Sequence, residues 1–387
     1  MLVDSWRWFG SQDPISLTDI RMTGVKHIVT ALHDIPIGEV WSYDAIMKHK
    51  QKIQEEGFKW YVTESLSLHE SIKYGGEERD GYIDKYITSM RHLSKAGVKV
   101  ICYNFMPIVD WTRTDLMCTY EDGSYALKFD WIDFVIVDVY ILQRKEGCSD
   151  YSNEIHELAR KKYSTMTEEQ KNTIKRNVIQ GLPGGMVDTN SLEKLEQMLT
   201  IYKLITKDQM LQNLHYFLSK VIPVAEKIGI YFAIHPDDPP ISLFGIPRIV
   251  STKEDIVRIL QTVDSPNNGL TLCVGSLASH PTNSVESIVE LCGNRIHFLH
   301  MRNVIKDRVV TNSFVESNHL QGDVNMVTVF SYMMKEKRDF PLYYRADHGH
   351  LMLDDMYKTN INPGYSLIGR LRGIAELRGI CAGLYGR

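Results

Sequence analysis

Four residues that can bind a metal ion follow one another along the C-terminal half of the chain. Each lies at or near the end of an apolar run typical of a buried strand, at residues 230–235, 269–274, 295–301 and 342–347. The four are His235, Cys273, His300 and Asp347. A single histidine or cysteine in such a run is usually only a buried side chain. Four of them at corresponding positions predict a shared metal site.

The types of ligand restrict the metal. Two imidazoles, one thiolate and one carboxylate suit Zn²⁺ or Fe²⁺, and the carboxylate also permits Mn²⁺. Cys273 would bind as the thiolate, because metal binding displaces the thiol proton. A catalytic ion would keep one position open for a substrate.

Candidates for proton transfer adjoin these ligands. His348 directly follows Asp347, and Tyr365 ends the turn sequence Asn362-Pro-Gly-Tyr365. Histidine exchanges protons near neutral pH. The sequence therefore predicts an acid–base pair beside the ion.

Other polar residues near predicted strand ends could bind the substrate. The guanidinium groups of Arg302, Arg345 and Arg248 match a carboxylate with two parallel hydrogen bonds. In the N-terminal half the candidates near predicted strand ends are Asn104, His33 and Trp111. This combination favours a hydroxylated, acidic small molecule.

The elements that must position these residues alternate between strand and helix. Eight strands are expected, at residues 5–9, 27–32, 59–64, 98–105, 230–235, 269–274, 295–301 and 342–347. Glycines at 57, 97 and 229 end helices just before three of these strands. Such alternation predicts an α/β fold, a (β/α)₈ TIM barrel that forms one domain over residues 1–387, with the site at the C-terminal ends of its strands.

A long segment, residues 106–229, separates the fourth and fifth expected strands. Helices are expected at 151–163, 168–180 and 191–202, and Thr167 with Gln170 forms a capping-box pattern. We interpret it as a helical insertion within the barrel. Because long ordered insertions are usually functional, part of residues 143–199 is expected to cover the site or to form a subunit contact, in a dimer.

Composition excludes several classes of protein. Of 387 residues, 43% are hydrophobic and 24% charged, as in globular proteins, and the net charge of −4 disfavours nucleic acid as a partner. Six scattered cysteines without a C-x-x-C pair indicate a reducing compartment, and no apolar run reaches the ~18 residues of a membrane span. No signal peptide or glycine-rich phosphate motif is evident. We expect a cytoplasmic protein without a nucleotide cofactor.

At these residues the sequence resembles the mannonate dehydratase family, and the resemblance runs from end to end. The segments that carry it are Trp6-Arg-Trp8, Thr30-Ala-Leu-His33, Val40-Trp-Ser42, Cys102-Tyr-Asn-Phe-Met-Pro107, Asp110-Trp-Thr-Arg-Thr-Asp115, His235-Pro-Asp-Asp-Pro-Pro240, Pro247-Arg-Ile-Val-Ser-Thr252, Asp347-His-Gly-His350 and Asn362-Pro-Gly-Tyr365. Local departures occur at Ala346, where a proline often precedes the aspartate, and at Asn303, where a serine is common.

The resemblance implies a metal-dependent lyase of hexuronate and glucuronate degradation, with Mn²⁺ or Fe²⁺ bound by His235, Cys273, His300 and Asp347. Such an enzyme converts D-mannonate to 2-keto-3-deoxy-D-gluconate and water, and we assign Tyr365 as its base and His348 as its acid. The alternatives are a sugar isomerase, another aldonate dehydratase or a phosphodiesterase on the same barrel, or a non-catalytic protein that binds sugar acids.

Overall fold

In a computed structural model that describes residues 1–179 and 192–386, the main sheet is parallel and contains all eight strands expected from the sequence. The first expected strand consists of two short pieces on either side of Ser5. The strands are β1 (Leu2–Asp4), β2 (Trp6–Arg7), β3 (His27–Thr30), β4 (Lys59–Glu64), β5 (Val100–Tyr103), β8 (Tyr231–Ile234), β9 (Asn268–Cys273), β10 (Ile296–His300) and β13 (Leu342–Arg345).

The first strand position closes the barrel. β1 pairs with β13 and β2 pairs with β3, both in parallel, so this segment joins the two ends of the sheet. At the junction the backbone N–H and the hydroxyl of Ser5 both donate to the carbonyl oxygen of Tyr344, at 2.7 and 2.8 Å. The (β/α)₈ barrel is confirmed.

Side chains from the strands fill the barrel interior, which explains their β-branched and aromatic composition. One buried cluster consists only of strand residues, namely Val29, Val62, Val100, Cys102, Ala233, Phe298 and Tyr343. Because this interior is packed, a ligand has room only beyond the ends of the strands.

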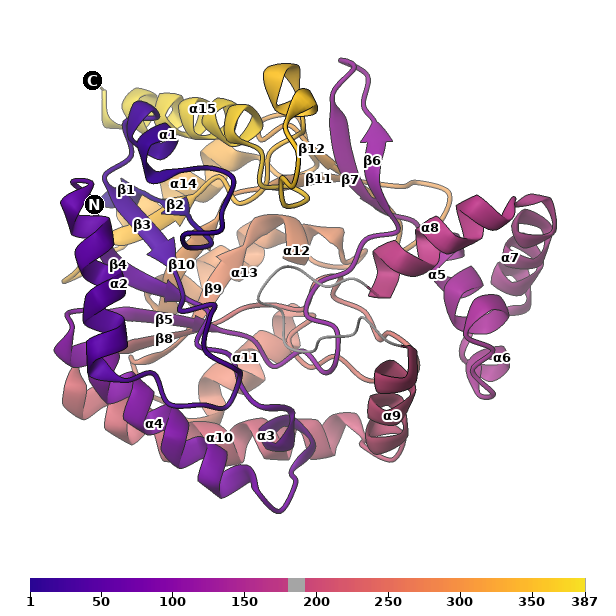
Figure 1. Cartoon of the computed structure of the whole chain (residues 1–387), viewed down its shortest axis with the longest axis horizontal. Coiled ribbons are helices and arrows are strands. Elements are labelled where there is room, and N and C mark those ends of the chain that lie inside the picture. Colours follow the sequence, from indigo (N-terminus) through magenta and orange to yellow (C-terminus); the bar gives the residue numbers. More distant parts are fainter. Residues whose placement is uncertain (180–191, 387) are drawn as a thin grey trace.

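Helices surround the barrel (Figure 1). The longer ones are α2 (Tyr43–Glu55), α4 (Arg79–Lys95), α10 (Lys207–Ile228), α11 (Lys253–Thr262), α13 (Val285–Cys292), α14 (Met326–Lys335) and α15 (Leu367–Tyr385). Short helices are α1 (Leu17–Met22), α3 (Glu70–Tyr74), α12 (Val274–Ser279), η2 (Gly293–Arg295) and η3 (Leu353–Tyr357). Gly229 ends α10 in the left-handed conformation, φ 69°, as the sequence predicts. Among the described residues no helix is both long and apolar enough to cross a membrane.

The insertion contains the helices expected there. They are α7 (Asn153–Thr165), α8 (Glu168–Ile179) and α9 (Leu192–Tyr202), preceded by α5 (Trp131–Val135), the π-helix η1 (Ile136–Ile141) and α6 (Gly147–Asp150). At the start of α8, Thr167 and Gln170 form the predicted reciprocal hydrogen bonds, at 2.9 and 3.2 Å. Figure 1 shows α6, α7 and α8 projecting away from the barrel. Residues 180–191, part of the segment expected to cover the site or contact a second subunit, lie outside the described residues.

A β-hairpin that the sequence analysis did not predict begins the helical insertion. Strands β6 (Asp115–Thr119) and β7 (Tyr125–Phe129) pair antiparallel, and β7 pairs in turn with β12 (Phe314–Ser317), which pairs with β11 (Asn303–Lys306). The result is a four-stranded antiparallel sheet that joins the insertion to the loop after β10. The rings of Phe129 and Phe314 stack at 5.8 Å between centroids where the two parts meet.

Candidate active site

The four predicted metal ligands come together at the C-terminal ends of adjacent strands. Nε2 of His235 lies 3.1 Å from Nδ1 of His300, and that nitrogen lies 3.8 Å from Oδ1 of Asp347. Sγ of Cys273 lies 3.7 Å from Oδ2 of Asp347. The ligand atoms of His235, Cys273 and His300 all lie within 4.8 Å of one another. We call these four residues the donor cluster.

The donor cluster has the chemistry that a divalent ion requires. Nδ1–H of His235 donates to the carbonyl oxygen of Pro236 at 2.6 Å, which leaves a lone pair on Nε2. Burial lowers the pKa of His235, so the ring is neutral, as a metal ligand must be. The hydroxyl of Ser276 donates to Sγ of Cys273 at 3.0 Å, a contact that stabilises a thiolate. These residues fit a divalent ion.

Arginines hold the carboxylate of Asp347 in place. Nε of Arg302 donates to Oδ2 at 2.8 Å, and Nη1 of Arg345 forms an ion pair with Oδ1. Burial alone would raise the pKa of Asp347, but the positive charge of Arg345, the strongest opposing influence, helps to hold it well below its ordinary value. The carboxylate is therefore ionised at neutral pH.

A cavity of about 510 Å³ opens above these ligands. Most residues that the sequence assigned to catalysis or substrate binding line it, together with two of the ligands: His33, Asn104, Trp111, His235, Arg345, Asp347, His348 and Tyr365. The volume is within the range of small-molecule sites in enzymes. The candidate site is thus one continuous pocket.

Several of the lining residues carry buried polar atoms that have no hydrogen-bond partner within the described part of the chain, and three of these atoms belong to uncharged side chains predicted to bind the substrate. They are Nε2 of His33, Oδ1 of Asn104 and Nε1 of Trp111. Burial is the largest of the effects that lower the pKa of His33 to about 3, so its ring is neutral. Unpaired buried donors and acceptors are costly, and in a pocket they are suited to the hydroxyl groups of a ligand.

The structure separates the three arginines that were grouped by sequence. Arg345 lines the cavity, whereas Arg302 and Arg248 are not among the lining residues. Nη2 of Arg248 donates to the carbonyl oxygen of Val109 at 2.6 Å, and Arg302 is bound to buried carboxylates. The guanidinium of Arg345 is itself bound by Glu64, at 2.8 and 3.0 Å.

The proposed acid and base lie side by side in the wall of the pocket. The rings of His348 and Tyr365 meet edge to face, 5.0 Å between centroids. Nδ1–H of His348 donates to Oε2 of Glu316 at 2.8 Å, which orients the ring. Burial raises the pKa of Tyr365 to about 12, although the positive charges of Arg345 and Arg7 oppose the rise.

The sequence analysis assigned no role to two carboxylates of this site. Glu64 ends β4 and lines the cavity, at the same position relative to its strand as the metal ligands, so the same argument could have found it. Glu316 lies on β12, in the antiparallel sheet that no sequence pattern predicted.

Glu316 belongs to an arginine–carboxylate cluster that we define as Arg113, Arg302, Asp238 and Glu316. Arg113 donates to Asp238 at 2.9 Å and to Glu316 at 2.6 Å. Arg302 forms a second ion pair with each of these carboxylates. Burial opposes the ionisation of Glu316, but His348 and the two arginines lower its pKa well below the ordinary value. All four side chains are at most 4% exposed, so the charges compensate one another without water.

Solved structures similar to this chain have the same barrel. A xylose isomerase-like TIM barrel protein from Mycobacterium smegmatis, 15% identical, aligns with a TM-score of 0.50 over 95% of this chain and 87% of that one. At this identity the likeness supports the fold alone. The structure of mannonate dehydratase from Streptococcus suis serotype 2 is 33% identical and aligns with a TM-score of 0.79, over 99% of this chain and 95% of that one.

Sequence comparison covers almost the whole chain. The protein named mannonate dehydratase 2 of Agrobacterium fabrum is 41% identical over 386 residues, 97% of this chain and 96% of the relative. The mannonate dehydratase of Saccharophagus degradans is 40% identical, again over 97% of this chain and 96% of the relative. Residues 2–385 match the family described as D-mannonate dehydratase (UxuA). This chain, with its donor cluster at the mouth of the barrel, belongs to the D-mannonate dehydratase family.

Proposed function

We propose that the protein is a hydro-lyase that converts D-mannonate to 2-keto-3-deoxy-D-gluconate and water. The observation that carries the proposal is the donor cluster at the floor of a pocket lined by Arg345, His348 and Tyr365, in a chain that matches the family over residues 2–385. We propose Mn²⁺ or Fe²⁺ as the ion, held by His235, Cys273, His300 and Asp347.

The reaction removes a proton from C2 of the substrate and a hydroxyl group from C3. When bound, the divalent ion would act as a Lewis acid toward the carboxylate and a neighbouring hydroxyl, and its charge would lower the pKa of Tyr365. The electron pair left at C2 forms the C2–C3 double bond as the hydroxyl departs from C3. The resulting enol then tautomerises to the 2-keto acid.

Two side chains of the pocket carry the proton transfers. Tyr365 takes the proton from C2, and His348 gives a proton to the departing C3 hydroxyl. Because Glu316 holds Nδ1 of His348 at 2.8 Å, the other ring nitrogen, Nε2, remains to exchange the proton with the substrate. The ring of Tyr365 packs edge to face on Phe9, 4.7 Å between centroids, which fixes the direction of the phenol.

Substrate recognition uses the remaining wall of the pocket. Arg345 supplies positive charge beside Asp347, and the unpaired atoms of His33, Asn104 and Trp111 are positioned to meet hydroxyl groups. A sugar acid presents one carboxylate and several hydroxyls, which matches this inventory of donors and acceptors.

The test is a panel of aldonates that differ in configuration at C2 and C3, incubated with protein reconstituted with Mn²⁺ or Fe²⁺. We expect 2-keto-3-deoxy acid from D-mannonate at the highest kcat/KM. If protein that elemental analysis finds loaded with the ion forms no keto acid from any aldonate, the proposal fails. A product that retains every oxygen of the substrate would instead indicate an isomerase.

A further inference from the structure

His300 belongs to two groups of potential metal ligands. One is the donor cluster, and the other consists of Glu64, Cys102 and His300, whose ligand atoms also lie within 4.8 Å of one another. The two nitrogens of the imidazole face different partners. Nδ1 lies 3.1 Å from Nε2 of His235, whereas Nε2 lies 3.4 Å from Oε2 of Glu64.

The second group is not suited to a metal ion. Glu64 accepts two hydrogen bonds from Arg345, at 2.8 and 3.0 Å, and forms an ion pair with Arg7. Cys102, the third member of the group, lies in the apolar cluster of strand residues inside the barrel. Burial raises the pKa of the Cys102 thiol, so at neutral pH it keeps the proton that a metal would displace.

Hydrogen-bond chemistry determines which nitrogen of each histidine carries a proton when an ion is bound. The carbonyl oxygen of Pro236 can only accept, so His235 is protonated at Nδ1 and offers Nε2. A carboxylate of Glu64 that is held by two arginines likewise can only accept. Nε2 of His300 is buried, and no hydrogen bond to another described residue satisfies it. Its nearest acceptor is therefore Glu64.

We propose that Glu64 is a positioning residue of the ion site: it accepts the Nε2–H of His300 and so directs Nδ1 of that ring toward the ion. The two histidines then use opposite nitrogens, Nε2 for His235 and Nδ1 for His300. Metal-bound histidines generally donate their other N–H to a carboxylate or a carbonyl, which fixes the orientation of the ring. This inference rests on the ion of the proposed function and adds the residue that orients one of its ligands.

The arginines make Glu64 a rigid acceptor. Arg7 and Arg345 come from β2 and the end of β13, two neighbouring strand positions of the closed barrel, and Glu64 is at most 5% exposed. Burial opposes ionisation of Glu64, but Arg345 and Arg7 hold its pKa well below the ordinary value. The two guanidinium groups thus hold the carboxylate in place beside His300.

Nitrogen NMR of protein with ¹⁵N-labelled histidine tests the assignment without any variant at Glu64. In protein loaded with Zn²⁺, which is diamagnetic, we expect His300 to be protonated at Nε2 and His235 at Nδ1. The signals among the 14 histidines are assigned by their loss in His300→Gln and His235→Gln. A His300 ring protonated at Nδ1 in the loaded protein would overturn the proposal.

Calorimetric titration with Mn²⁺ tests the role of Glu64 in binding. In Glu64→Gln the amide oxygen keeps the position of Oε1, which accepts from Arg7 and from Nη2 of Arg345, because these groups only donate. The NH₂ group then takes the position of Oε2, loses the bond from Nε of Arg345 and faces Nε2 of His300, which forces the ring proton to Nδ1. We expect the affinity for Mn²⁺ to fall about 10–100-fold. The matched control is Glu70→Gln, a buried carboxylate that accepts from Lys73 at 2.9 Å and lies outside both groups of ligands. It should bind Mn²⁺ as the wild type does.

The outcomes separate this inference from the proposed function. If the wild type binds one Mn²⁺ per chain and folded Glu64→Gln binds it equally tightly, Glu64 does not position His300, while the proposed function stands. Two Mn²⁺ per chain, with one lost in Cys102→Ala, would make Glu64 a ligand and also overturn the inference. A wild type that binds no Mn²⁺, Fe²⁺ or Zn²⁺ would overturn the proposed function first.

Discussion

The donor cluster and the arginine–carboxylate cluster are both buried and are joined by the hydrogen bond from Arg302 to Asp347, yet their polar atoms are satisfied differently. In the arginine–carboxylate cluster each carboxylate, Asp238 or Glu316, contacts both Arg113 and Arg302. In the donor cluster two imidazole nitrogens face each other at 3.1 Å around a shared point.

The difference distinguishes a scaffold from a site. Complementary charges that are paired with one another connect the antiparallel sheet to the barrel. In the donor cluster, nitrogen, sulfur and oxygen atoms that can bind a metal converge at four adjacent strand ends, an arrangement typical of a ligand site. Arg302 connects the two, since it contacts Asp238 in one cluster and Asp347 in the other.

The largest expected effect is on the donor cluster. Chelation should abolish dehydration of D-mannonate, and Mn²⁺ or Fe²⁺ should restore it, since the ion stabilises the negative charge that develops on the substrate. Cys273→Ala should weaken metal binding without unfolding the barrel. The control is Cys102→Ala, on β5 and outside the donor cluster, which should bind metal as the wild type does. Full turnover by protein that elemental analysis finds free of metal would contradict this prediction.

The arginine–carboxylate cluster should respond in stability instead. Arg113→Met leaves Asp238 and Glu316 with one arginine between them, so the free energy of unfolding should fall by about 3–5 kcal/mol, measured in urea. The control is Arg372→Met, which removes partly exposed ion pairs to Asp122 and Glu376 and should cost less than about 1 kcal/mol. If Arg113→Met and Arg372→Met lowered the free energy of unfolding equally, the buried arginine–carboxylate cluster would stabilise the fold no more than an exposed ion pair does.

The third prediction concerns Tyr365 and His348, the two residues proposed to transfer protons. Tyr365→Phe and His348→Asn should each lower kcat by ~10² or more and leave folding and metal content unchanged. Exchange of deuterium from solvent into C2 of mannonate separates their roles. If Tyr365→Phe exchanges C2 at the wild-type rate, Tyr365 is not the base, and His348 takes that role.

Neighbours of the same residue types serve as controls for this pair. Tyr103 is buried with no described partner for its hydroxyl, and His350 donates to the carbonyl oxygen of Glu316 at 2.9 Å. Neither lines the cavity. Tyr103→Phe and His350→Asn should therefore retain kcat within a few-fold.

The barrel was predictable because its signal is local. The strands are short apolar runs, three of them directly after a helix that ends in glycine, and β4 has the predicted bounds, residues 59–64. The antiparallel sheet was not predictable in this way. β7 and β12 pair across about 190 residues of chain, and β6 is half exposed without a regular alternation of apolar and polar residues. Glu316 was missed with the sheet that carries it.

The donor cluster followed from the same local reasoning, because the ends of adjacent parallel strands meet at one rim. The roles of the three arginines could not be predicted by this reasoning. Arg302, Arg248 and Arg345 have the same residue type and comparable positions, but only contacts between distant segments decide whether a guanidinium faces a ligand or a buried carboxylate. For Arg302 those partners, Asp238 and Glu316, come from two other parts of the chain.

Lowering the pH should reduce the free energy of unfolding by a smaller amount, because it protonates the paired carboxylates. The pKa values of Asp238, Glu316, Asp347 and Glu64 all lie below their ordinary values: burial opposes this, and nearby arginines outweigh it. Their contribution to stability is therefore present above the unfolded values near 4 and is lost as the pH falls through the folded values. Between pH 6 and pH 4 the free energy of unfolding of metal-free protein should drop by about 2 kcal/mol. A free energy of unfolding that stays constant between pH 6 and pH 4 would contradict this prediction.

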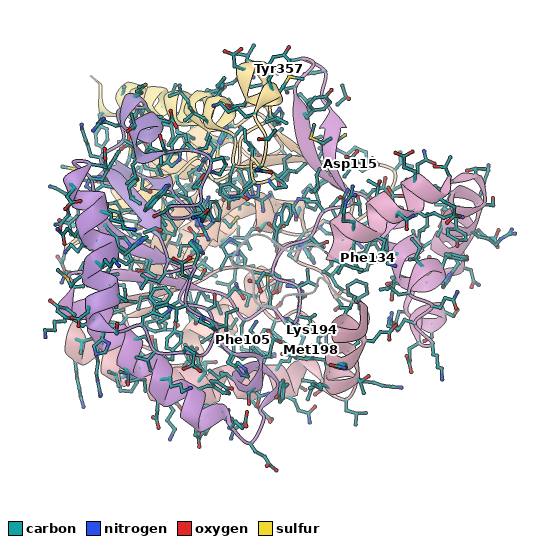
Figure 2. The ribbon with its side chains drawn as sticks, in the orientation of Figure 1. Phe105, Asp115, Phe134, Lys194, Met198 and Tyr357 are labelled. Carbon is teal, nitrogen blue, oxygen red and sulfur yellow. The ribbon has the colours of Figure 1, made fainter. Side chains whose placement is uncertain are left out.

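The smallest expected effect concerns the far wall of the pocket. Lys194 on α9 lines the cavity (Figure 2), and the hydroxyl of Tyr202, at the end of α9, donates to Oε2 of Glu70 at 2.6 Å and so anchors that helix. Lys194→Met keeps the length of the side chain but removes its charge. Because an exposed charge contributes at most ~1 kcal/mol, KM for D-mannonate should rise less than about tenfold, with kcat unchanged and the effect reduced in 1 M salt. Lys203→Met, which removes an exposed ion pair to Glu146 outside the cavity, should leave KM unchanged. An identical KM for both variants at low salt would show that α9 adds no charge to substrate binding.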